Sequence, residues 1–148
     1  MSTEYILELY KQLGHEQNKY VYFMLAAAAS AMGFAIQKTT GMRVAWALVP
    51  IGIAIVLWSI SFYYGSLNRI ATNAVLHANL DLLKLYGKVH ERQPPTTQTT
   101  EIAIKSTEEK LSIENEKAAR YGIRQFRFLI AGGIAFLIWH IIEMIRVS

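Results

Sequence analysis

Three apolar stretches, nearly free of charged residues, divide this chain. They cover residues 20–36, 44–64 and 128–145 and hold 17, 21 and 18 residues. A helix that crosses a bilayer needs about 20 consecutive apolar residues, with roughly 17 to 25 tolerated. The pattern therefore predicts an all-α membrane protein with three transmembrane helices, organised as one membrane domain over residues 1–148.

Polar and apolar positions also alternate with helical spacing before the first span. Residues 3–19 carry apolar side chains at intervals of three and four, with charged residues between them; the apolar positions are Ile6, Leu9, Tyr10 and Leu13. This spacing predicts an amphipathic helix that continues into the first span. No small-residue cleavage site follows a charged and apolar leader here, so we expect the N-terminus to be retained.

The helical pattern continues beyond the second span. Apolar residues recur at helical spacing through residues 65–90, which predicts one helix from about Val44 to His90. At 1.5 Å per residue such a helix is roughly 70 Å long, more than twice the hydrocarbon thickness. It must therefore project out of the membrane, and Pro50 predicts a bend in its spanning part.

A proline-containing loop is expected at the far end of this projection. Residues 91–105 include Pro94 and Pro95 followed by polar residues, and Ser106 with Glu109 has the spacing of a capping box. The sequence thus predicts that helices 2 and 3 extend into an antiparallel helical hairpin over residues 65–127. No heptad run and no internal repeat is apparent.

The basic residues predict an orientation. Of the 15 Lys and Arg residues, 12 precede the first span or lie between the second and third, and 3 lie in the other segments. The positive-inside rule then places the N-terminus and the hairpin in the cytoplasm and the C-terminus outside, in a cell (inner) membrane. Tyr20, Tyr22, Tyr63 and Tyr64 would form an inner aromatic belt, and Trp46 and Trp139 an outer one.

Several classes of chemistry find no support in the sequence. The chain has no cysteine, so disulfides and thiolate sites are excluded. His77 and Asp81 have the spacing of two metal ligands on a helix, but two ligands are too few for a metal site. No catalytic, phosphate-binding or nucleic-acid-binding motif is present, and we expect neither an enzyme nor a cofactor.

Polar residues within the spans are candidates for an ion path. His140 and Glu143 lie one turn apart in the third span, and Ser59 and Ser61 lie in the second. Ionisable groups in a membrane helix are costly and often functional. The alternative is that Glu143 reaches the headgroups beside Arg146 while His140 lies at the interface next to Trp139.

Small residues predict close helix packing. Ala29 and Gly33 in the first span are four residues apart, and Ala131, Gly132 and Ala135 cluster in the third. In lipid this spacing allows helix backbones to approach each other, within one chain or between chains. Three spans make a thin bundle, so we expect a homo-oligomer.

A basic stripe precedes the third span. Its members Lys117, Arg120, Arg124 and Arg127 share one helix face. They predict contact with anionic lipid headgroups. The alternative is that they bind a small phosphate-bearing ligand.

Together these patterns predict a small oligomeric inner-membrane protein that acts as an ion-conducting or membrane-perturbing channel or effector, controlled by its cytoplasmic hairpin. The alternative is a non-conducting scaffold or accessory subunit that docks a cytoplasmic partner protein through the hairpin. Pore-forming effectors of antiviral defence and phage holins share this general build, although no motif in the chain identifies either family.

Overall fold

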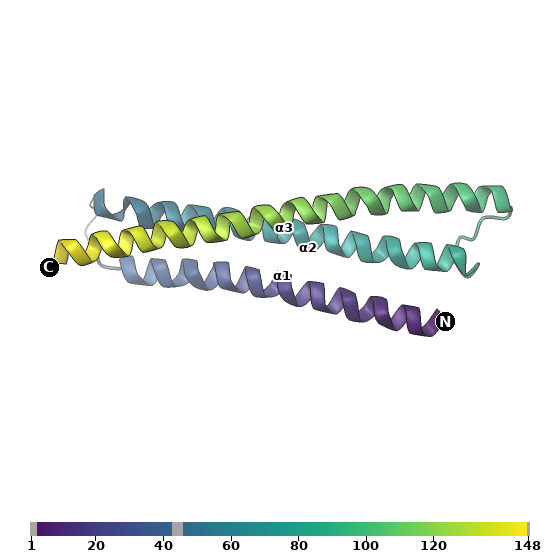
Figure 1. The fold of residues 1–148 in the computed structure, drawn as a ribbon, viewed down its shortest axis with the longest axis horizontal. Helices are drawn as coiled ribbons and strands as arrows, with labels where there is room; N and C mark the ends of the chain where they lie inside the picture. The colour runs from purple at the N-terminus through teal and green to yellow at the C-terminus, as the bar shows by residue number, and fades with distance from the viewer. Residues whose placement is uncertain (1–2, 43–45, 148) are drawn as a thin grey trace. The chain divides into compact units, whose positions relative to one another are not determined.

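The computed structural model describes residues 3–42 and 46–147, and nearly all of that part of the chain is helical (Figure 1). The elements are α1 (Thr3–Thr39), the short 3₁₀ helix η1 (Trp46–Leu48), α2 (Val49–Tyr86) and α3 (Thr97–Val147). By length and composition α1, α2 and α3 each contain a segment able to cross a membrane. The all-α class and the three potential spans are therefore confirmed.

Helix α1 joins the N-terminal segment to the first span without interruption. The described side chains do not include those of Ile6, Leu9, Tyr10 and Leu13, on which the predicted amphipathic pattern rests. The helix ends at Thr39, where the hydroxyls of Thr39 and Thr40 each donate to the carbonyl of Ile36 at 3.0 Å. Gly41 then turns the chain with a positive φ of 82°, a conformation that glycine adopts without strain.

Pro50 begins α2 and does not bend it. It is the second residue of the helix, where a backbone amide has no partner to lose and a fixed φ already suits the helix. The prediction of a bend within the span was therefore wrong. Val44, the predicted start of this helix, lies outside the described residues.

Helix α2 ends at Tyr86, four residues before the predicted end at His90. The Lys88 amide donates to the Leu85 carbonyl at 3.2 Å, and the Val89 amide donates to the Lys84 carbonyl at 3.0 Å. Lys88 adopts a left-handed φ of 55°. This pair of bonds is a Schellman motif, which satisfies the last carbonyls of the helix and ends it.

Helix α3 begins at Thr97, so the connection between α2 and α3 is shorter than the predicted loop 91–105. The Thr99 amide donates to the Thr96 hydroxyl oxygen, and the Thr96 amide donates to the Thr99 hydroxyl oxygen, each at 3.3 Å. This reciprocal pair is a capping box with threonine at both positions. Ser106 lies inside the helix, so its prediction as the cap was wrong.

The contacts within the chain divide it into two compact units. Unit 1 comprises Met1–Lys19 and Asn68–Arg120, and unit 2 comprises Tyr20–Leu67 and Tyr121–Ser148. Each unit takes one segment from each of the three long helices.

Apart from Met24, the described buried positions in the three long helices of unit 2 repeat every seven residues. They are Val21, Ala28 and Ala35 in α1; Ala54 and Ser61, with Ile51, Trp58 and Gly65, in α2; and Gln125, Gly132 and Trp139 in α3. A seven-residue repeat is typical of helices that pack side by side as in a coiled coil. The repeat is not apparent in the sequence because small and polar residues occupy many of these positions.

Two tryptophans form the centre of unit 2. Trp58 and Trp139 are each 5% exposed and pack with Ala35, Ile51 and Ala54. The Trp58 indole N–H donates to the Leu129 carbonyl at 3.2 Å, which links α2 to α3. Trp139 is thus a core residue and not part of an exposed aromatic belt, whereas Trp46 is 78% exposed as an interfacial residue would be.

Among its described residues, unit 1 buries no tryptophan and has several contacts at the surface. Ala71, Ala78 and Leu85 are buried on α2 at a mutual spacing of seven residues, out of phase with the repeat in unit 2. The Tyr86 hydroxyl donates to Glu108 Oε1 at 2.9 Å and so links α2 to α3 at the surface. Asp81, predicted to share a helix face with His77, lies 3.7 Å from His90 Nε2.

Candidate functional site

The two span serines form hydrogen bonds within unit 2. Ser61 is fully buried, and its hydroxyl donates to the backbone carbonyl of Gln125 at 2.8 Å, so it joins α2 to α3. Ser59 is on the exposed side of α2, and its single hydroxyl proton has two acceptors in reach, the Ile55 carbonyl at 2.8 Å and the Met32 sulfur at 3.2 Å. Neither serine lies beside His140 or Glu143 in the pocket described next.

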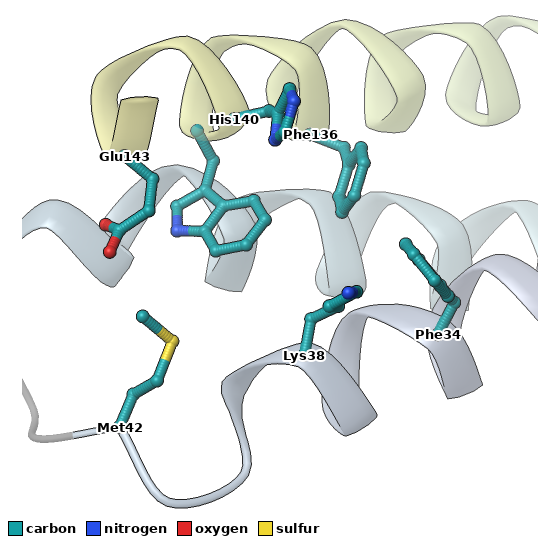
Figure 2. A pocket seen from close by; sticks show the side chains of 7 residues that line it. Phe34, Lys38, Met42, Phe136, His140 and Glu143 are labelled. Carbon is teal, nitrogen blue, oxygen red and sulfur yellow. The ribbon is translucent and has the colours of Figure 1, made fainter. Parts of the chain in front are cut away.

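The other two polar span residues share a pocket of about 550 Å³ in unit 2. It lies between the C-terminal ends of α1 and α3, as Figure 2 shows. Its lining residues are Phe34, Lys38, Met42, Phe136, Trp139, His140 and Glu143. The sequence placed His140 and Glu143 together, but it gave no sign that Lys38 would join them.

Opposite charges line this pocket. Lys38 reaches into it from α1 and Glu143 from α3 (Figure 2). The Lys38 ammonium lies 5.5 Å from the centre of the Phe34 ring, and among the described residues it forms no ion pair. Glu143 Oε1 accepts a hydrogen bond from Arg146 at 2.6 Å. The cation and the carboxylate are therefore held apart, each by a contact on its own helix.

Two polar atoms of the pocket residues are buried without a hydrogen-bond partner in the described part of the chain. They are the second carboxylate oxygen of Glu143, Oε2, and the indole nitrogen of Trp139. A buried donor or acceptor that has no partner costs about 1–3 kcal/mol. Both atoms are closed to a water-sized probe, so a bound molecule could pair with them only after neighbouring side chains shift.

His140 and Glu143 also have the neighbours expected if both lie at a membrane interface rather than in an ion path. Glu143 is bound to Arg146, and the rings of Trp139 and His140 lie 6.4 Å apart between centroids. His140 is on the exposed side of α3.

The predicted packing residues differ in their surroundings. Gly132 is buried, and a Cβ added there would lie 2.5 Å from Trp58 Nε1. Ala131 and Ala135 are half-buried, and Ala135 packs against the tryptophan core. Ala29 and Gly33 are exposed, and no atom of the described residues beyond the neighbouring backbone of α1 lies within 4 Å of a Cβ added at Gly33. The third span thus uses its small residues within the chain, whereas α1 leaves a small-residue face open.

Gln125 is a buried polar residue that the sequence interpretation missed. Its side chain is 1% exposed, and its amide nitrogen has no hydrogen-bond partner among the described residues. That nitrogen would lie 2.5 Å from a Cβ added at Gly65. The signal was its position seven residues before Gly132, which places it on the same helix face.

The basic stripe is divided between the two units. In unit 1, Lys117 pairs with Glu114 at 2.7 Å. In unit 2, the Arg124 guanidinium lies 5.5 Å from the centre of the Tyr64 ring, and its Nη1 donates to the Tyr64 hydroxyl at 3.4 Å.

The two remaining members of the stripe are exposed. Arg120 lies 3.9 Å from Glu116 in unit 1, and Arg127 is an exposed residue of unit 2. Neighbouring carboxylates thus offset the two members in unit 1, Lys117 and Arg120.

The described side chains of unit 2 therefore combine a closely packed core with an amphipathic pocket at one end. Unit 1 offers exposed helices that carry ion pairs. Comparison of the chain with protein-family models, with curated proteins and with solved structures found no match.

Proposed function

We propose that this chain is a non-conducting membrane scaffold, anchored in the inner membrane by unit 2, whose unit 1 docks a cytoplasmic partner protein. Large apolar side chains are exposed along each candidate span, including Phe23, Ile53 and Ile134. Lipid would cover such surfaces, which supports insertion of unit 2. The excess of basic residues in the segments 1–19 and 65–127, which contain unit 1, supports a cytoplasmic unit 1.

The non-conducting interpretation rests on the hydrogen bonds that polar residues of the candidate spans form to other residues of the same chain. Ser59, Ser61 and Glu143 each form a hydrogen bond to a neighbour in unit 2. An ion path needs polar groups directed at water or at the ion. Three of the four predicted path residues instead contribute to helix packing or to surface pairing.

Apolar residues on the surface of unit 1 support a docking function. Ile70, Val89, Ile102 and Ile113 are each more than half exposed. In a cytoplasmic segment these side chains would face water, and apolar contact points of this kind are used in protein interfaces.

An ion-flux measurement tests this proposal. The purified chain is reconstituted into liposomes that hold a potassium or proton gradient, with gramicidin as the positive control. We expect the gradient to persist at a protein density at which gramicidin dissipates it. Dissipation by the chain would contradict a non-conducting scaffold.

Docking is tested separately in cells. A photo-crosslinking amino acid at Ile102 should capture a protein, whereas the same group at the span residue Ile134 should capture lipid. Capture of lipid at both positions would contradict a cytoplasmic docking surface.

A second candidate is an oligomeric channel or membrane-perturbing effector with its path between copies of the chain. His140 is exposed within a candidate span, and Ala29 and Gly33 form an open small-residue face suited to self-association. If flux is observed, Gly33→Leu should reduce both the oligomer mass in nanodiscs and the flux, and His140→Ala should change the flux alone. Flux that neither substitution alters would contradict this arrangement.

A further inference from the structure

The pocket between α1 and α3 lies where two candidate spans end. The span in α1 ends at Thr39 and the span in α3 ends at Arg146, close in sequence to Lys38 and Glu143. All the lining residues belong to unit 2, so the pocket is formed within one unit. With unit 2 in a bilayer, its opening would lie at the level of the lipid headgroups.

The polar groups of the pocket match a zwitterion. Lys38 supplies a cation, and Glu143 Oε2 supplies an acceptor that Arg146 leaves unused. The Trp139 indole adds a buried N–H donor without a partner in the described chain. Once the Glu143 and Trp139 side chains shift to expose these buried atoms, a molecule with one ammonium donor and one anionic group would satisfy all three.

The apolar wall of the pocket matches a lipid body. The Phe34 and Phe136 rings lie 5.9 Å apart between centroids at an angle of 59°. Figure 2 shows them on the side of the pocket away from Glu143, with Phe34 on α1 and Phe136 on α3. A glycerol backbone and the start of an acyl chain would cover these rings.

We propose that this pocket binds a phospholipid whose zwitterionic headgroup carries a primary ammonium, as in phosphatidylethanolamine. The ammonium donates to Glu143 Oε2, and the phosphate lies against the Lys38 ammonium. The Trp139 N–H donates to a phosphate or ester oxygen, and the acyl chain packs on Phe34 and Phe136. The proposal rests on insertion of unit 2 in a bilayer and is independent of whether the chain conducts ions or docks a partner.

Lipid retention by native mass spectrometry tests the ammonium contact. The chain is released from nanodiscs that contain equal amounts of phosphatidylethanolamine, phosphatidylcholine and phosphatidylglycerol with the same acyl chains. Phosphatidylcholine has the same charges but no N–H to donate, so we expect it to be retained about tenfold less than phosphatidylethanolamine, as the loss of one charge-assisted hydrogen bond implies. Glu143→Gln should remove this preference. The exposed carboxylate of α3 in unit 1 gives the matched control Glu109→Gln, which should keep it.

The phosphate contact has its own variant. Lys38→Gln should lower the retention of phosphatidylethanolamine and phosphatidylcholine alike, and Lys105→Gln should leave both unchanged. If Glu143→Gln loses its helical circular dichroism, the lipid preference of the unaltered chain still decides the question.

Three results would overturn the proposal. Equal retention of phosphatidylethanolamine and phosphatidylcholine would exclude recognition of the ammonium. A preference for phosphatidylglycerol would reveal a site for an anionic headgroup. Inorganic phosphate, added in a detergent free of phospholipid and followed by ³¹P NMR, tests a free-phosphate site; binding that Lys38→Gln abolishes, without any lipid preference, would assign the pocket to free phosphate.

Discussion

The helices within unit 1 and the helices within unit 2 are held together by different kinds of contact. In unit 2 the helices meet along a seven-residue repeat of small residues and tryptophans, and buried hydrogen bonds join α2 to α3 through Trp58 and Ser61. In unit 1 the described contacts between α2 and α3 include a surface hydrogen bond from Tyr86 to Glu108, and ion pairs such as Lys84 with Glu91 lie in the open.

This difference is what we expect if unit 2 lies in lipid and unit 1 in water, as proposed above. In lipid no hydrophobic effect drives helices together, so close packing and interhelical hydrogen bonds must do so. In water apolar burial stabilises the helices, and exposed ion pairs add only about 0–1 kcal/mol each. We therefore expect unit 1 to open more readily than unit 2, because fewer large side chains are buried between its α2 and α3 segments.

The largest expected effect comes from the contact between Gly132 and Trp58. Gly132→Ala places a methyl group 2.5 Å from the Trp58 indole nitrogen, and the ring has to leave its hydrogen bond to Leu129. Overpacking and the lost bond together should lower the free energy of unfolding by about 2–4 kcal/mol. Titration with a denaturing detergent, followed by circular dichroism, measures this change.

Gly133→Ala is the matched control, because in the described part of the chain only the neighbouring backbone of α3 comes within 4 Å of a Cβ added there. Its unfolding should match that of the unaltered chain or need slightly more denaturant. Equal destabilisation by the two alanines would mean that the Trp58 contact does not hold unit 2 together.

The next effect is local to unit 1 and concerns the first turn of α3. Thr96→Ala removes the hydroxyl that accepts from the Thr99 amide, and loss of such a cap costs about 1 kcal/mol. Amide hydrogen exchange of residues 97–100 should therefore accelerate about fivefold. Ser106→Ala should leave the exchange of these amides unchanged. Acceleration by Ser106→Ala would instead support Ser106 as the cap, as the sequence pattern predicts.

The helix ends show which part of the fold is readable from the sequence. The three spans and the continuity of α1 followed from long runs of apolar periodicity. The ends of α2 and α3 did not, because they depend on single backbone contacts. Lys88 takes the left-handed position beside a glycine, and Thr99 stands where a capping box usually has Glu or Gln.

The pocket and the packing seam show why the site was only partly predictable. His140 and Glu143 are neighbours on one helix, so spacing alone placed them together. Lys38 belongs to another helix, and only tertiary packing brings it to the same pocket. The seven-residue repeat of buried positions was not predicted because many of them, such as Ala28 and Gly132, are small residues that do not stand out as an apolar pattern.

A smaller effect should distinguish the two serines of the second span. Ser61→Ala removes a buried bond between α2 and α3 and should lower the free energy of unfolding by about 0.5–1 kcal/mol, as interhelical bonds in membrane proteins do. Ser59→Ala, an exposed position on the same helix, should change it by less than about 0.5 kcal/mol. A larger loss at Ser59 would show that its exposed face is covered in an oligomer.

The smallest effect concerns the ion pairs of unit 1. Lys84 and Glu91 lie 3.8 Å apart with side chains 45% and 87% exposed, so dissolved ions screen their attraction effectively. Raising NaCl from about 0.05 M to about 1 M should accelerate amide exchange near these residues by less than about fivefold. The amides around Trp58 should not respond, because packing and a buried hydrogen bond protect them. Glu91→Gln should abolish the effect of salt on amide exchange at Lys84. An equal effect of salt on amide exchange in both units would contradict the conclusion that packing stabilises unit 2 and ion pairs contribute to unit 1.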